Sequence, residues 1–254
     1  MSAAPSAGWP LATALLLLVL LAVGVATAGG LGIRRDIVTA AVRAVAQLAV
    51  VSLAIAAVLG SVLWSAAFAV LMFAVATFTS ARRVGAVPDL AWLSAGIAAG
   101  VAPVLTLLFV SGTIPLNGAS LVPTAGIIIG GAMTANTLAG RRAFDELRHG
   151  LGMYEAALAL GMTRRDAVLE VISPSAGEAL TPVLDQTRTV GLVTLPGAYI
   201  GVLLGGGSPV EAGAAQIMVL VGLLAAETIA VVVLVQLIAL GRVTPKALRT
   251  QMAA

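Results

Sequence analysis

The chain has 254 residues, of which 60% are hydrophobic and only 10% are charged, and its mean hydropathy is +1.08. Soluble domains are roughly 45–50% apolar, so this composition excludes water as the only solvent of the fold. The net charge of +3 comes from basic residues beside apolar runs, without interleaved aromatic residues, which argues against nucleic acid as a partner. The chain has no cysteine, which excludes a disulfide framework.

The apolar runs predict about seven transmembrane helices. Most of them reach the roughly 20 residues that cross a hydrocarbon core, and lipid offers the backbone no partner outside a helix or a closed barrel. Runs such as 14–21 and 229–235 are apolar on every face, whereas the strands of a barrel alternate. We expect an all-α fold with one transmembrane domain over 1–254. Its spans are expected at residues 11–29, 37–59, 62–80, 91–111, 121–140, 189–205 and 213–240.

The basic side chains are confined to alternate loops. The loops at 1–10, 60–61, 112–120 and 206–212 contain none of them. Because basic loops stay on the cytoplasmic side, we expect a bacterial inner-membrane protein with its amino terminus outside and its carboxyl terminus in the cytoplasm. The fourteen basic residues assigned to that side are Arg34, Arg35, Arg43, Arg82, Arg83, Arg141, Arg142, Arg148, Arg164, Arg165, Arg188, Arg242, Lys246 and Arg249.

One long polar segment, about 141–188, is predicted to face the cytoplasm as a pair of helices. Its first half has apolar side chains at the spacing of an amphipathic helix, namely Phe144, Leu147, Leu151 and Leu158. Gly161 interrupts that helix. Thr163 and Asp166 resemble a capping box, so a second helix is expected to begin there and to end before Pro174.

The same segment contains a spaced motif. It reads Glu155-Ala156-Ala157, three residues, Gly161, nine residues, Val171, one residue, Ser173-Pro174. This resembles the EAA loop of bacterial ABC permeases, which has Ile and Leu where this chain has Val171 and Ser173. Small alanines allow another protein to approach closely, Glu155 can accept hydrogen bonds from it, and Gly161 permits a turn. The resemblance implies a coupling helix in a groove of an ATPase; the alternative is a surface helix rich in alanine for its helix propensity.

Nucleotide chemistry is not expected of this chain. It has no Gly-x-x-x-x-Gly-Lys phosphate loop, and Lys246 is its only lysine. We therefore predict that the chain is not an enzyme, that it needs no cofactor, and that ATP is hydrolysed by a separate cytoplasmic ABC ATPase subunit.

Four further segments are similar to the Fet-type iron-export ABC permease family, whose plant relatives act in aluminium tolerance. The segments are 43–48, 126–133, 189–197 and 216–219. The resemblance implies a lipid-embedded homodimer of permeases with two ATPase subunits, exporting a metal ion, with iron as the substrate of the bacterial members. The chain departs from the family pattern at Gly131, Ala198 and Tyr199. No metal ligands can be named, because the only histidine, His149, lies in the cytoplasmic segment.

Polar residues inside the spans are candidates for a translocation pathway. Arg43 and Gln47 lie one helical turn apart on one face of the second span, where the arginine either points to a pathway or reaches back to the interface. Asn136 in the fifth span is a further candidate, and an interhelical hydrogen bond is the alternative.

The last spans add three candidates. Pro196 and Gly197 break the sixth span, either beside a cavity or as a packed kink. Glu227 lies in the middle of the last span, where it could bind a cation, carry a proton or make a structural hydrogen bond. Glu227 also supports a competing hypothesis, a secondary transporter or cation channel that needs no ATPase.

Overall fold

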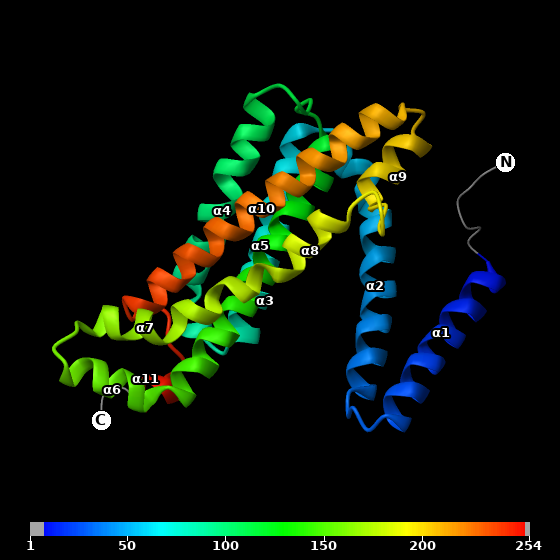
Figure 1. The fold of residues 1–254 in the computed structure, drawn as a ribbon. Coiled ribbons are helices and arrows are strands. Elements are labelled where there is room, and N and C mark those ends of the chain that lie inside the picture. Colours follow the sequence, from blue (N-terminus) through cyan, green and yellow to red (C-terminus); the bar gives the residue numbers. More distant parts are fainter. Residues whose placement is uncertain (1–7, 252–254) are drawn as a thin grey trace. The chain divides into compact units, whose positions relative to one another are not determined.

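The computed structural model describes residues 8–251, so the predicted positions of the two chain ends, 1–7 and 252–254, lie outside the described residues. The described part is all-α, as predicted (Figure 1). Six helices are long and apolar enough to cross a membrane: α1 (Trp9–Ala28), α2 (Arg34–Leu59), α3 (Val62–Val84), α4 (Leu90–Val110, with the short helix η1, Val87–Asp89, before it), α5 (Gly118–His149) and α10 (Pro209–Ala239).

The chain divides into two compact units, and the first ends at Val58. Within it, α1 and α2 are joined by a short turn. Gly30 and Gly32 have φ values of 67° and 69°, a left-handed conformation that suits glycine. The first unit is thus a helical hairpin of two apolar helices.

The second unit, Leu59–Ala254, is a bundle in which α3, α4, α5 and α10 pack together. Its core forms two clusters. The basal cluster joins the ends of three long helices, including Val84, Phe144 and Ala239. The central cluster lies further along the same helices and includes Ile128 and Ala226. The bundle therefore has a continuous apolar core from the basal end to its middle.

Small residues allow these helices to approach closely. A β-carbon on Gly100 of α4 would overlap the carbonyl of Ala226 in α10, and one on Gly140 of α5 would lie 3.0 Å from a methyl group of Val84. Close packing through small residues is the usual way that helices associate in lipid, because lipid tails compete with any larger apolar contact.

Helix α5 extends well beyond the predicted span 121–140. Asn117 caps its start by accepting a hydrogen bond from the Ser120 amide at 3.0 Å, and the helix then continues for 32 residues to His149. The predicted amphipathic helix is therefore not one element. Its first residues belong to α5, and it breaks at Gly150, whose backbone (φ −95°, ψ 18°) leaves the α-helical region. A β-carbon there would lie 2.9 Å from both the Glu146 carbonyl and Val171.

The second helix of the polar segment, α7, runs from Arg164 to Ala176, so the prediction that it ends before Pro174 is wrong. Proline lacks the amide for one hydrogen bond but has a φ that suits a helix, and the buried Val171 and Ile172 fix the preceding turn in the basal cluster. The chain then continues through the short helix η2 (Gly177–Leu180) into α8 (Thr181–Thr189).

The sixth predicted span, 189–205, is broken. Residues 190–196 form a turn, in which the Gly191 amide donates to the Thr194 carbonyl at 2.8 Å, and only α9 (Gly197–Leu204) is helical. Together, α7, α8 and α9 follow α10 along its length (Figure 1), and α7, α8 and α9 each contact it. The remaining helices are α6 (Leu151–Ala159) and α11 (Lys246–Gln251).

Candidate functional site

The turn between α6 and α7 is built around Gly161. The Met162 amide donates to the Ala157 carbonyl at 3.1 Å, and the Gly161 amide donates to the Leu158 carbonyl at 2.9 Å. This pair of bonds is a Schellman motif, which requires a left-handed residue after the helix. Gly161 has a φ of 88°, so the predicted turn is present and needs glycine.

Helix α7 begins where the sequence predicts, at the Thr163 cap. The Thr163 hydroxyl accepts a hydrogen bond from the Asp166 amide at 3.2 Å and donates to the Asp166 carboxylate at 2.7 Å. The cap satisfies an amide that the helix itself leaves unpaired. Two short helices and a defined turn thus make a rigid hairpin, α6–α7.

One side of α6 is held by the bundle and the other is free. Tyr154 and Ala157 are 3% and 6% exposed and belong to the basal cluster. Glu155 and Ala156 are exposed, and Leu160, beside the turn, is 84% exposed. We call four of the exposed residues of α6 and its turn, Met153, Glu155, Ala156 and Leu160, the hairpin tip. It offers a carboxylate within an apolar, small-residue surface.

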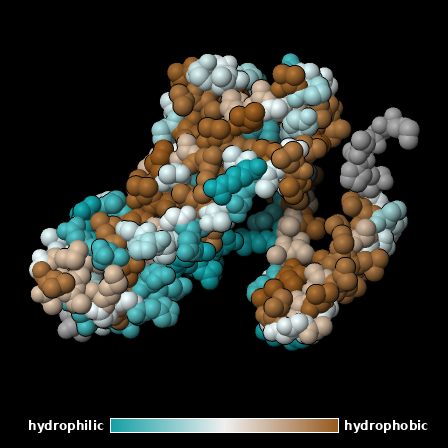
Figure 2. All heavy atoms as spheres, in the orientation of Figure 1, coloured by the Kyte–Doolittle hydropathy of each residue, from teal (hydrophilic) through white to brown (hydrophobic). Residues whose placement is uncertain are grey.

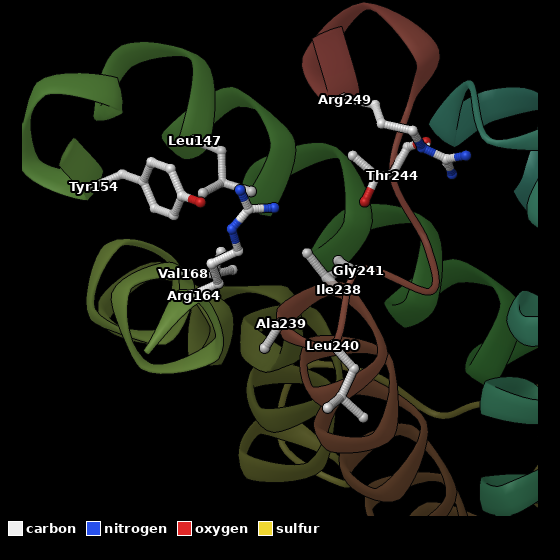
Figure 3. A pocket seen from close by; sticks show the side chains of 10 residues that line it. All are labelled: Leu147, Tyr154, Arg164, Val168, Ile238, Ala239, Leu240, Gly241, Thr244 and Arg249. Atoms are coloured by element: carbon white, nitrogen blue, oxygen red, sulfur yellow. Dashed lines mark hydrogen bonds between the residues drawn. The ribbon is translucent and has the colours of Figure 1, made fainter. Parts of the chain in front are cut away.

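A cavity of about 390 Å³ lies behind the hairpin, between it and the end of α10 (Figure 3). The Arg164 guanidinium and the Tyr154 hydroxyl point toward each other across it, while the Arg249 guanidinium points away. Arg249 instead donates to the Asp89 carboxylate at 3.2 Å. The lining residues are Leu147, Tyr154, Arg164, Val168, Ile238, Ala239, Leu240, Gly241, Thr244 and Arg249.

Asn136 is the most enclosed of the polar candidates. It is fully buried in α5, and neither of its amide atoms has a hydrogen-bond partner among the described residues. Its oxygen lies 3.9 Å from the position that a β-carbon would take on Gly96 of α4. Within residues 8–251, Asn136 therefore makes no interhelical hydrogen bond, the alternative role considered for it.

Glu227 is 8% exposed and packs against Gly131. Among the residues that the structure describes, none makes a hydrogen bond or ion pair with its carboxylate. Gly131, where the chain departs from the family pattern, supplies the space that the carboxylate fills. Sequence reasoning singled out both residues without connecting them, because nothing in their spacing indicates that α5 and α10 meet there.

Pro196 and Gly197 lie at the start of α9, where Pro196 is the residue that caps the helix. The Tyr199 amide donates to the side-chain oxygen of Gln216 in α10 at 3.3 Å, and Gln216 is 3% exposed. The start of α9, where the break at Pro196 was predicted, is thus held against α10 by the buried amide side chain of Gln216.

Arg43 and Gln47 lie on α2 in the first unit, and both are exposed. The remaining candidates, Asn136, Pro196, Gly197 and Glu227, belong to the second unit. Two of the six candidates are thus described with the first unit and four with the second. Within residues 8–251, no group of three or more histidine, aspartate or glutamate side chains is placed to hold a metal ion.

Two polar features escaped the sequence prediction. Thr137 donates to Ser80 at 3.0 Å and links α5 to α3 inside the bundle. On α8, Asp185 and Arg188 lie 3.5 Å apart with exposed side chains. Their spacing of three residues could have indicated that they share one face of a helix. In the sequence prediction, Arg188 served only to assign the side of the membrane.

These features define a class: the chain is an α-helical membrane protein that crosses the bilayer several times. It belongs to the family described as "Uncharacterised protein family (UPF0014)", whose model matches residues 9–241. This match and the relatives described next confirm the expected family membership.

Three relatives illustrate the family. "Protein ALUMINUM SENSITIVE 3" of Arabidopsis thaliana is 32% identical over 85% of this chain and 80% of its own length. "UPF0014 membrane protein STAR2" of Oryza sativa subsp. japonica is 33% identical over 83% and 75%. "Probable iron export permease protein FetB" of Escherichia coli is 35% identical over 54% and 53%. No solved structure matches the chain.

Proposed function

We propose that the chain is the transmembrane permease subunit of an ABC transporter and that a separate ATPase subunit docks on the α6–α7 hairpin. The observation that carries this proposal is the hairpin tip. Glu155 and Ala156 are exposed on a helix that ends in the Schellman turn at Gly161. Both residues belong to the stretch that resembles the EAA loop and are available to a partner, whereas Ala157 of the same motif is buried in the basal cluster.

The charge distribution supports a cytoplasmic location for the hairpin. The basal cluster gathers Val84, Phe144 and Ala239, and arginines follow or flank each of these helix ends. By the positive-inside rule this end faces the cytoplasm, with the amino terminus outside and the carboxyl terminus inside a bacterial inner membrane. An ATPase at the basal end would then meet the hairpin directly.

The hairpin is connected to the bundle in a way that suits coupling. From α7 the chain passes through η2 and α8 without a flexible loop, and Val183 of α8 belongs to the central cluster together with Ala226 of α10. A force on the hairpin tip would be transmitted along this path into the middle of the bundle. The cavity beside Arg164 leaves room for the hairpin to move against α10.

Iron is the substrate we propose, and the support is kinship. The relative from Escherichia coli is named as a probable iron export permease protein, and the other two relatives extend over most of this chain. The candidate pathway residues remain Arg43, Gln47, Asn136, Pro196, Gly197 and Glu227. We propose that residues 1–254 act as a single permease domain and that two copies work with two ATPase subunits.

Charge reversal at the tip tests the docking site. The chain would be expressed with a candidate ABC ATPase from the same genome, solubilised in mild detergent, and recovered by a tag on the chain. We expect Glu155→Arg to reduce the recovered ATPase at least tenfold, because the exposed carboxylate could no longer accept hydrogen bonds from basic groups of the ATPase and the new cation would repel them. Glu146→Arg, at an exposed site on α5 outside the tip, is the matched control. Equal recovery with both variants would disprove docking at Glu155.

Glu227 supports a second candidate function, a secondary transporter or cation channel. Its carboxylate is buried without a partner among the described residues, as expected of an ion-binding or proton-carrying group. This hypothesis predicts cation flux driven by a gradient through the purified chain alone, and loss of that flux in Glu227→Gln. The proposed ABC function predicts no flux without the ATPase.

A further inference from the structure

A polar stripe follows one side of the chain from η2 into α8. Its members are spaced by three, four and three residues, which places them on one helical face: Glu178, Thr181, Asp185 and Arg188. All four are exposed. The side chains of Asp185 and Arg188 are 60% and 71% exposed, and their closest charged atoms are 3.5 Å apart. We call these four residues the α8 stripe.

The buried residues on the opposite face of the same segment indicate how deep in the membrane the stripe lies. Ala179 belongs to the basal cluster, whereas Val183 belongs to the central cluster together with Leu223, Ala226 and Ala230. Those three α10 residues lie near the middle of the candidate span Pro209–Ala239. The segment thus rises from the basal end into the bundle, and Asp185 and Arg188 follow Val183 toward the membrane centre.

Charged side chains at this depth do not face lipid. A charge near the bilayer centre costs several kcal/mol, and such groups point toward protein or water. Figure 2 shows a hydrophilic patch over α8 with hydrophobic surface on α10 and α9 around it. Within the second unit the patch is uncovered, since both charged side chains are more than half exposed.

We infer that the α8 stripe faces the α8 stripe of a second copy, and that the two stripes line a water-containing pathway between the copies. The stripe is self-complementary in charge, because it presents an acid and a base one helical turn apart. A two-fold axis along the membrane normal places residues of the two copies opposite each other at the same membrane depth. Arg188 of one copy can therefore reach Asp185 of the partner subunit. The inference rests on the proposed pair of permeases and names the surface through which they meet.

Cysteine cross-linking tests this pairing without background, because the chain contains no cysteine. Asp185→Cys and Gln186→Cys would be oxidised with copper phenanthroline in native membranes and separated on non-reducing gels. Gln186 is also exposed, so it serves if replacement of Asp185 prevents insertion. The matched control is Val232→Cys, an apolar position on α10 that is 53% exposed.

We expect more than half of the Asp185→Cys or Gln186→Cys protein in a band of twice the chain mass, and less than one tenth for Val232→Cys. A water-soluble maleimide should label the two α8 cysteines at least tenfold faster than the control. Monomeric α8 variants, or a dimer only at Val232→Cys, would overturn the inference, whatever the labelling. The test uses neither ATPase nor ATP, so its failure would leave the docking of an ATPase on the hairpin to be judged separately.

Discussion

Glu227 of α10 and Gly131 of α5 share one space, since the Glu227 Oε1 atom lies 2.5 Å from the position that a β-carbon would take on residue 131. Leu223 borders the same position. The adjacent glycine, Gly130, has no such neighbour within 4 Å. The two glycines therefore differ in packing while belonging to the same turn of the same helix.

Alanine at position 131 is expected to destabilise the bundle. The added methyl group overlaps Leu223 and the Glu227 carboxylate, and overpacking of this kind costs about 1–3 kcal/mol. Gly130→Ala should be neutral or stabilising by up to about 1 kcal/mol, because alanine is the better helix former. Thermal unfolding of both variants in detergent measures the difference.

The contact itself can be isolated with a double variant. Gly131→Ala combined with Glu227→Ala should recover only the part of the lost stability that the carboxylate overlap causes, because the overlap with Leu223 remains. If Gly131→Ala and Gly130→Ala unfolded at the same temperature, the packing of Glu227 against α5 would be incorrect.

Asn136 allows a separate prediction. Its amide is buried without hydrogen bonds, and an unsatisfied buried polar group costs about 1–3 kcal/mol. Asn136→Leu, which has a similar size, should raise the melting temperature. It should also lower transport severalfold if the amide serves the pathway, as we propose. A clear loss of thermal stability would instead mean that the amide is bonded in the folded protein.

The turn at Gly161 predicts a difference between two substitutions. Alanine is strained at a φ of 88° by roughly 1–2 kcal/mol, whereas asparagine tolerates left-handed geometry better. Gly161→Ala should therefore increase cleavage at the hairpin by an added protease severalfold, and Gly161→Asn should restore much of the protection. Identical cleavage of the native chain and both variants would argue against a rigid turn.

The sequence predicts the long helices well because each is a continuous apolar run. It also predicts the turn at Gly161 and the cap at Thr163, since both depend on neighbouring residues alone. The break at Gly150 was missed because the apolar spacing of Leu147 and Leu151 continues across it. The contact between Gly131 and Glu227 was missed because it joins two helices that are far apart in sequence. Local pattern does not reveal which helices pack together.

The broken crossing was predicted only in part. Pro196 indicated an interruption, but the sequence placed the polar residues of α8 in a cytoplasmic loop because polar segments usually lie outside the membrane. Val183 instead packs in the central cluster beside Ala226. A helix with one polar face has too low a mean hydropathy to be predicted as a membrane span, although a helical bundle can enclose such a helix.

The most direct test of the coupling role is ATP-driven iron transport in proteoliposomes that contain the chain and the ABC ATPase recovered with it. The account predicts ATP-dependent movement of iron with the native chain, and at least a tenfold loss with Glu155→Arg but not with Glu146→Arg. It also predicts no movement when the ATPase is omitted. Iron or cation flux through the chain alone, unchanged by Glu155→Arg and abolished by Glu227→Gln, would contradict the account and favour a transporter that needs no ATPase.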